Sequence, residues 1–314
     1  MKRQLLIAEF LSTPWALMPE RLNAVAGVLA RWSHGAAASD AVMETVAADR
    51  QAREAKKAGA AQAASGGIAV LPFYGVVTQR GNMMDDISGP GSVSTQRFTA
   101  AFREALADDT VGSILIDIDS PGGSVYGVAE LAEEIYQARS QKPVVAIANS
   151  LAASAAYWVG SAASEFYVTP GGEVGSIGVW QAHYDYSQAL AEEGIKPTLI
   201  SAGKYKVEGN AYQPLDADAQ AFMQSRVDDY YAAFTKGVSR GRNVGIAKVR
   251  DGMGQGRVLG ADAAQAENMV DGVMTVDAVI KKMQRDMRAA RSGAQRTGSA
   301  RTTRAAELQL LNLG

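Results

Sequence analysis

The chain has 314 residues, of which 47% are apolar and 20% charged, which is ordinary for a globular protein and excludes disorder along the whole length. Its 31 basic and 33 acidic residues give a formal net charge of −2, so no overall electrostatic attraction to nucleic acid or to an anionic membrane is expected. The sequence contains no cysteine, which excludes disulfides, thiolate metal sites and a cysteine nucleophile.

The first 67 residues predict a helical segment followed by a linker. Residues 15–32 place apolar side chains at helical spacing, and residues 36–67 are rich in alanine and charged residues before ending in Ala-Ala-Ser-Gly-Gly. The apolar stretch at the N-terminus is interrupted by Glu9 and Pro14, which argues against an export signal. Since no apolar run approaches the roughly 20 residues needed to cross a bilayer, we expect no membrane span.

Residues 68–282 alternate between strand-like and helical patterns, which predicts an α/β domain with a parallel sheet. Helices are expected at 98–106, in the segment ending near residue 139, at 152–163 and at 216–239. Strands are expected at 68–77, 111–119, 144–148, 165–168 and 174–180. Residues 81–95 are rich in glycine, serine and aspartate and predict a loop.

Residues 283–314 predict a disordered basic tail. Arginines recur along this segment among glycine, serine and threonine, with few acidic residues. We expect the tail to be solvated, or else to dock on an acidic partner or nucleic acid.

Ser154 and Lys206 stand in distinctive local sequences and indicate a serine nucleophile with a lysine base. The chain has only two histidines, His34 and His183, and neither lies beside a recognisable triad signature. A lysine accepts a proton only when it is neutral, so burial must lower its pKa from about 10.4 toward roughly 7–8.

Two segments can supply amide donors for an oxyanion. Ser154 lies where a strand gives way to a helix, and small neighbours leave the Ala155 amide uncovered. A second donor is expected at Gly122 or Gly123, in a Ser-Pro-Gly-Gly turn that follows a strand. No zinc or calcium motif, P-loop or dinucleotide fingerprint occurs, so no cofactor and no metal are predicted.

Four motifs in order give the chain a family resemblance, which covers roughly residues 68–273. Within this region the chain resembles the signal peptide peptidase A family of serine peptidases and, within it, the head maturation proteases of tailed bacteriophages, of the minor capsid protein C type. The motifs are Asp119-Ser-Pro-Gly-Gly123, Ala152-Ala-Ser-Ala-Ala-Tyr-Trp158, Gly175-Ser-Ile-Gly-Val179 and Gly203-Lys-Tyr-Lys-Val-Glu-Gly209.

The resemblance implies roles for individual residues. Ser154 is then the nucleophile, Lys206 the base, and Ser176 a hydrogen-bonding partner that orients the lysine. Lys204 is a rival base because residues two apart on a strand share a face. His183 is a further alternative, in a serine–histidine arrangement like that of the Clp proteases.

The resemblance also implies a Clp/crotonase-like fold of repeated ββα units and hydrolysis of peptide bonds through an acyl-enzyme. Crotonases share this fold but need catalytic carboxylates near the oxyanion hole, where this chain has alanines and a serine. The alanine- and glycine-rich surroundings predict a small or apolar residue before the scissile bond.

The implied role is maturation of a phage head by cleavage of capsid, portal or scaffold proteins, in the bacterial host cytoplasm or inside the procapsid. Family members form rings, so a homo-oligomer is expected. Two alternatives stay open: a bacterial peptidase that degrades signal peptides, and a non-catalytic capsid assembly factor on the same fold.

Overall fold

The structure is a computed structural model that describes residues 14–18, 67–80, 92–290 and 292. Most of the predicted N-terminal helical segment and linker, most of the loop at 81–95 and nearly all of the predicted basic tail lie outside these residues.

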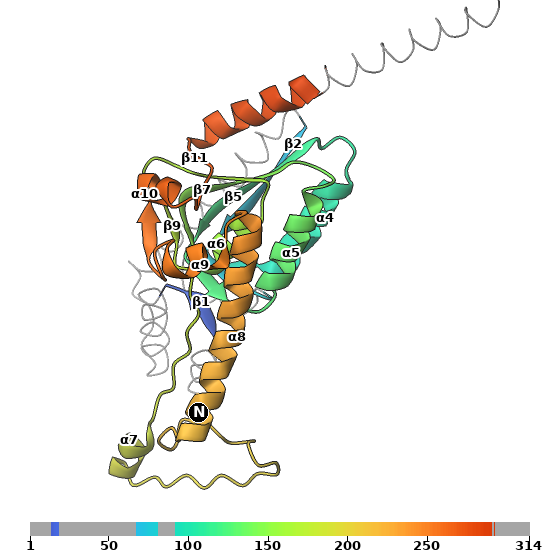
Figure 1. The fold of residues 1–314 in the computed structure, drawn as a ribbon. Coiled ribbons are helices and arrows are strands. Elements are labelled where there is room, and N and C mark those ends of the chain that lie inside the picture. Colours follow the sequence, from blue (N-terminus) through green and yellow to red (C-terminus); the bar gives the residue numbers. More distant parts are fainter. Residues whose placement is uncertain (1–13, 19–66, 81–91, 291, 293–314) are drawn as a thin grey trace, which may run out of the picture.

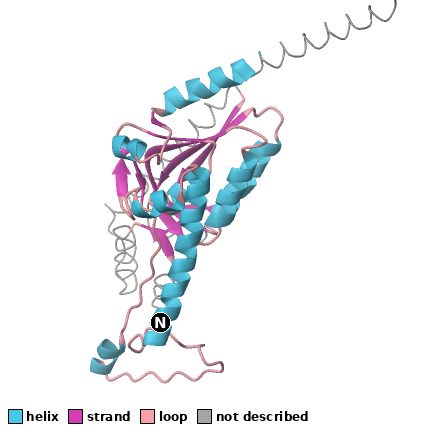
Figure 2. Cartoon of the chain, in the orientation of Figure 1, coloured by secondary structure: helices cyan, strands magenta, loops and turns pink. Residues whose placement is uncertain are grey.

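A largely parallel sheet forms the centre of the molecule (Figures 1 and 2). Three long strands, β2, β5 and β7, lie parallel to one another in that order. The other edge of β7 pairs with β8 along its first half and with β9 near its end. Among the described strands of this sheet, only β10, which pairs with β9, is antiparallel. The α/β class is therefore confirmed, whereas the repeated ββα units stay a prediction. The strands are β2 (Ile68–Tyr74), β5 (Ser113–Ser120), β7 (Val144–Ala153), β8 (Glu165–Val168), β9 (Glu173–Gly175), β10 (Val258–Gly260) and β11 (Gly272–Val273).

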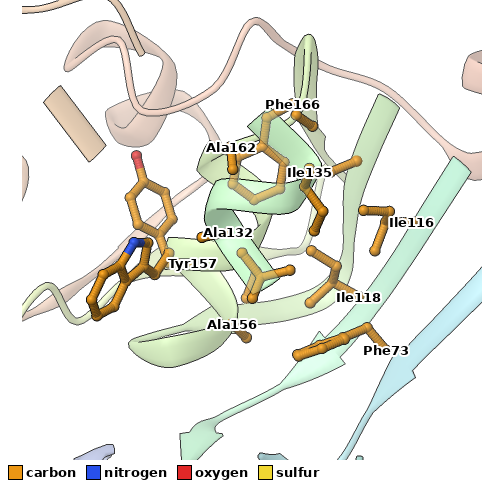
Figure 3. Close-up of a cluster of buried hydrophobic side chains, with 14 of the residues drawn as sticks. Phe73, Ile116, Ile118, Ala132, Ile135, Ala156, Tyr157, Ala162 and Phe166 are labelled. Carbon is orange, nitrogen blue, oxygen red and sulfur yellow. The ribbon is translucent and has the colours of Figure 1, made fainter. Parts of the chain in front are cut away.

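One face of the sheet is covered by helices. Alternate residues of β5, Ile114, Ile116 and Ile118, point into a large apolar core, as the period of two in a strand requires. Figure 3 shows Ile118, Ile135 and Phe166 meeting Ala156 and Tyr157 in this core. The covering helices are α4 (Thr95–Ala107), α5 (Val128–Ala138) and α6 (Ala155–Ser161).

The other face is covered by a helix at residues 276–290. Its Val279 and Met283 pack on Leu115, Val145 and other residues of the opposite strand faces, forming a second apolar cluster. The domain boundary predicted at residue 282 therefore cuts through a helix that belongs to the packed core. The remaining predicted tail residues, except Ser292, lie outside the described part.

Four short strands form a second sheet in the order β1-β6-β3-β4. Residues 15–17, predicted to begin a helix, instead form β1, because they pair antiparallel with β6. The apolar residues at helical spacing lie after residue 18, within the stretch 19–66 that the structure does not describe. The strands are β1 (Trp15–Leu17), β3 (Val76–Thr78), β4 (Ser92–Ser94) and β6 (Gly122–Ser124).

A long segment leaves the body of the domain after the sheet. Figure 1 shows α7 (Ser187–Glu192) far from the sheet, near the N-terminal end of α8 (Ala217–Gly241). The predicted helix at 216–239 is thus confirmed as α8, and Asp216 caps it by accepting the Ala219 amide. After α8 come α9 (Ile246–Asp251) and α10 (Ala261–Ala266). No helix among the described residues is both long and apolar enough to cross a membrane.

The strand that leads to Ser154 is longer than predicted. Alanine favours helix, and the alanine-rich segment predicted a helix from residue 152. In the structure β7 continues to Ala153, because Leu151–Ala153 pair with Glu173–Gly175 of β9. The helix begins only at Ala155, so Ser154 is the junction between strand and helix.

Candidate active site

Ser154 is held in a strained backbone conformation at the junction of β7 and α6. Its φ of 57° and ψ of −120° lie in a region that non-glycine residues rarely adopt, and such strain is concentrated at functional sites. Its amide donates to the Gly175 carbonyl at 2.7 Å, and its carbonyl accepts from the Trp158 amide at 3.0 Å. The residue is only 1% exposed. The two hydrogen bonds and the core on both sides fix this conformation.

Helix α6 is clamped from behind by the C-terminal half of α8. Trp158 stacks on Phe234 with ring centroids 4.8 Å apart. Gly237 and Gly241 allow this approach, because a side chain at Gly237 would overlap the Trp158 indole and one at Gly241 the Ser161 carbonyl. Because a helix as short as α6 is not stable by itself, packing against α8 stabilises it and fixes its position.

Gly122 and Gly123 lie directly beside Ser154. A Cβ built on Gly122 would come within 2.8 Å of the Ser154 Cβ, and the φ of Gly122 is 92°, so only glycine fits here. The Gly122 amide donates to Ser120 Oγ at 3.2 Å. Gly123 lies between β1 and β3, where a Cβ would overlap the Val77 carbonyl. The Ala155 amide is the first amide of α6, and the amides of a helix's first turn have no hydrogen-bond partner within the helix.

Ser176 also lies at this junction. It follows Gly175, which pairs with Ala153, and its amide donates to the Arg257 carbonyl at 2.8 Å. Its φ of 53° makes it a second non-glycine residue with a left-handed backbone beside the serine. The structure thus brings Ser154, Ala155, Ser176 and the two glycines together.

Strand β1 covers this site, which the sequence did not predict. Ala16 pairs with Gly123, and its carbonyl oxygen lies on the same side of Gly122 as the Ser154 Cβ. The other edge of β1 pairs with Trp180 through two backbone hydrogen bonds of 2.9 and 3.0 Å.

Lys206 is not brought to Ser154 within one chain. Every residue from 191 to 206 is exposed, on the segment that leaves the domain beside α7 (Figure 1). Lys204 is also exposed, with its Nζ 4.6 Å from the centroid of the Tyr205 ring. His183 Nε2 lies 3.0 Å from the Asn210 carbonyl, which can only accept a hydrogen bond, so Nε2 is engaged as the donor in this contact.

Charged groups support the site from a distance. Arg242 makes a bidentate pair with Asp271, with N–O distances of 2.8 and 2.9 Å, and Asp271 also accepts the Phe166 amide at 2.7 Å. Burial acts to raise the pKa of Asp271, but these hydrogen bonds outweigh it and leave the pKa below its usual value. Among the described residues, no three His, Cys, Asp or Glu side chains cluster as metal ligands would.

Comparison with known proteins matches the region around this site to a family model. The model of peptidase family S49 matches residues 136–290, which include Ser154, Ser176 and Lys206. The chain is similar to the "Head-tail preconnector protein GP5" of Enterobacteria phage P21, with 40% identity over 173 residues, which are 55% of this chain and 34% of that protein. It is similar to the "Capsid assembly protease C" of Escherichia phage lambda, with 38% identity over 185 residues, 59% of this chain and 42% of that protein.

A more distant relative is the "Protease 4" of Haemophilus influenzae, with 26% identity over 209 residues, covering 66% of this chain and 34% of that protein. The matched region spans less than half the length of each of these three relatives.

Proposed function

We propose that the chain is a serine endopeptidase with Ser154 as nucleophile and Lys206 as base, on the premise that the match of residues 136–290 to the peptidase family S49 model marks a peptidase domain. The observation that carries the proposal is the strained, buried Ser154, packed against Gly122 and followed by the Ala155 amide. Such a junction presents a hydroxyl and amide donors to one carbonyl group.

The base arrives through a contact that buries the segment around Lys206. A lysine needs loss of water to become neutral, and residues 191–206 are exposed in the single chain. Apolar side chains on and beside this segment are exposed as well, Ile200 to 95%, which is typical of a surface covered by a partner. We assign that partner as a second copy of the chain, in the homo-oligomer expected from the sequence. The side chains are Ile195, Leu199, Ile200, Tyr205 and Tyr212.

In the proposed reaction Lys206 takes the Ser154 proton as the oxygen adds to a peptide carbonyl carbon. The amides of Ala155 and Gly123 hold the negative charge on the carbonyl oxygen, and Ser176 orients the lysine. The C–N bond then breaks, the amine leaves with the proton from the lysine, and water hydrolyses the ester. The proposal requires neither cofactor nor metal.

The proposed substrates are capsid, portal or scaffold proteins, cleaved during assembly of a phage head in the host cytoplasm or the procapsid. Support comes from the phage relatives at 40% and 38% identity, whose names refer to a head-tail preconnector and to capsid assembly. Relatives named only as proteases match at 32% and 26% identity, below both phage relatives, so degradation of signal peptides is the second choice. A non-catalytic assembly factor would have no use for the strained Ser154.

The experiment is cleavage of peptides and of a mixed protein substrate, followed by mass spectrometry. We expect Ser154→Ala and Lys206→Ala each to reduce the rate at least about 10³-fold. Lys204→Ala is the matched control, because it removes an equally exposed lysine two residues away, and it should retain the rate within about threefold. Loss of activity in Lys204→Ala but not in Lys206→Ala would assign the base to Lys204. Full activity in Ser154→Ala would overturn the proposal.

A further inference from the structure

Strand β1 fills a slot between two other segments of the chain. One edge of the slot is β6, where Trp15, Ala16 and Leu17 pair antiparallel with Ser124, Gly123 and Gly122. The other edge is Trp180, which exchanges two backbone hydrogen bonds with Trp15, and whose indole Nε1 donates to the Leu17 carbonyl at 2.9 Å. Without β1, β6 would be an edge strand with an open row of backbone groups, which is a template for an added strand.

The slot passes directly over the nucleophile. A Cβ on Gly122 would overlap the Ala16 carbonyl oxygen and would lie 2.8 Å from the Ser154 Cβ, so both atoms border the same point of the slot. Ser154 is 1% exposed and Ala155 is fully buried, so an external peptide carbonyl has no access to them while β1 is in place. The Met18 amide continues the pairing on the far side with a 3.4 Å hydrogen bond to the Pro121 carbonyl.

We propose that this slot is the peptide-binding groove of the site and that β1 is its resident occupant, a strand of the chain itself lying in the register of a substrate. The Ala16–Leu17 peptide bond then marks the position of the bond that is cut. Polypeptide substrates bind as an extended strand by displacing β1. This inference rests on the proposed peptidase function.

The register predicts which residue a substrate presents before the cut. The Ala16 side chain is fully buried in the main core, so the groove accommodates a methyl group there and has no room for a large side chain. Leu17 and Trp15 instead pack with Val76 and Trp180, an apolar cluster that favours apolar residues on both sides. The ligand class is thus an extended apolar peptide with a small residue at the position of Ala16.

The test uses a single thiol, since the chain has no cysteine. Leu17→Cys is made in a Ser154→Ala background, where no cleavage interferes, and the side chain at position 17 is only 1% exposed while β1 is docked. A synthetic peptide with the sequence of residues 12–20 is added, and labelling by a maleimide is followed. Because β1 is covalently attached, its effective concentration is of the order of millimolar, so a few millimolar peptide should raise the labelling rate about fivefold or more.

Two controls make the result specific. The same peptide with tryptophan in place of the alanine should leave the rate unchanged, because the groove cannot hold the larger side chain. A thiol from Ala138→Cys, buried to the same degree in α5 but outside the slot, should not respond to either peptide. Equal labelling at position 17 with and without the first peptide would overturn the groove assignment.

A second measurement separates this inference from the proposed function. The unmodified protein should cut the same peptide between alanine and leucine, and should leave the tryptophan peptide intact. Displacement without any cutting would contradict the peptidase function and leave the groove in place. Cutting of other peptides without displacement of β1 would contradict the groove assignment alone.

Discussion

The two halves of the proposed dyad lie in contrasting surroundings. Ser154 is enclosed by β7, α6, Gly122 and β1, and each contact is made by a part of the same chain. Lys206 lies in a run of exposed residues on the segment next to α7, away from the sheet (Figure 1). The first region is built by the core of one domain, whereas the second gains no burial from it.

Two separate free-energy costs follow from this difference, the backbone strain at Ser154 and the loss of water around Lys206. The strain at Ser154 is offset by folding of the domain itself, because the core and the pairing with β9 stabilise the conformation. Loss of water around a lysine costs several kcal/mol, and that cost must be offset by a contact that a single copy does not make. A nucleophile that is ready in one copy and a base that depends on assembly would confine proteolysis to the assembled state.

The largest expected effect comes from mixing two inactive variants. Ser154→Ala and Lys206→Ala each lack one half of the dyad, yet in a mixed oligomer a Lys206→Ala copy can meet the intact lysine of a Ser154→Ala neighbour. We expect a 1:1 mixture, assembled together, to regain about a quarter of the wild-type rate, since random neighbours give one productive pairing in four. The measurement is peptide hydrolysis after joint refolding.

Separate preparations mixed below the concentration of assembly serve as the control for this experiment and should stay inactive. A co-assembled mixture that remains inactive, while the wild type is active, would place both groups of the dyad in one copy.

Gly122→Ala tests the enclosed surroundings of Ser154. The methyl group would overlap the Ala16 carbonyl and crowd the Ser154 Cβ at 2.8 Å, on a backbone whose φ of 92° disfavours alanine. We expect a loss of about 2–4 kcal/mol in the free energy of unfolding, together with a loss of peptide cleavage. Gly171→Ala is the matched control: no atom lies within 4 Å of its Cβ, so its stability should change by less than about 0.5 kcal/mol. Equal stability of the two variants in urea unfolding would contradict the packing described here.

Arg242→Met should give a smaller loss of stability in the same domain core. The Arg242 side chain is 6% exposed and binds Asp271, which in turn accepts the Phe166 amide, so we expect a loss of about 2 kcal/mol in the free energy of unfolding near pH 7. Arg226→Met is the control, because its pair with Asp229 is exposed and should contribute less than about 0.5 kcal/mol.

The Arg242 effect should depend on pH in a defined direction. Since the folded-state pKa of Asp271 is lowered, its stabilisation is fully present above the unfolded-state pKa of about 3.9 and is lost as pH falls through the folded value. The difference between wild type and Arg242→Met should therefore shrink below about pH 4. A difference that stays constant from pH 7 to pH 3 would show that the ion pair is not its cause.

Local patterns predicted most of the central domain. The nearly continuous apolar runs of β5 and β7, and the helical spacing in α8, depend on neighbours within one element, so they are visible in the sequence. The motifs around Ser154, Ser176 and the two glycines also predicted that these residues lie close together. Each motif follows a strand of one sheet, so the motifs share one edge of it.

The sequence by itself thus determined the α/β class, a change from strand to helix near Ser154 and the glycines beside it. Only the tertiary structure decided that β7 runs on to Ala153, that residues 15–17 form a strand over the site, and that Lys206 stays exposed. The pairing of Ala16 with Gly123 and of Ala153 with Gly175 joins segments far apart in the chain, and it overrides local helix preference. Exposure of Lys206 likewise depends on which surfaces meet in the folded protein, and a local motif does not predict which surfaces those are.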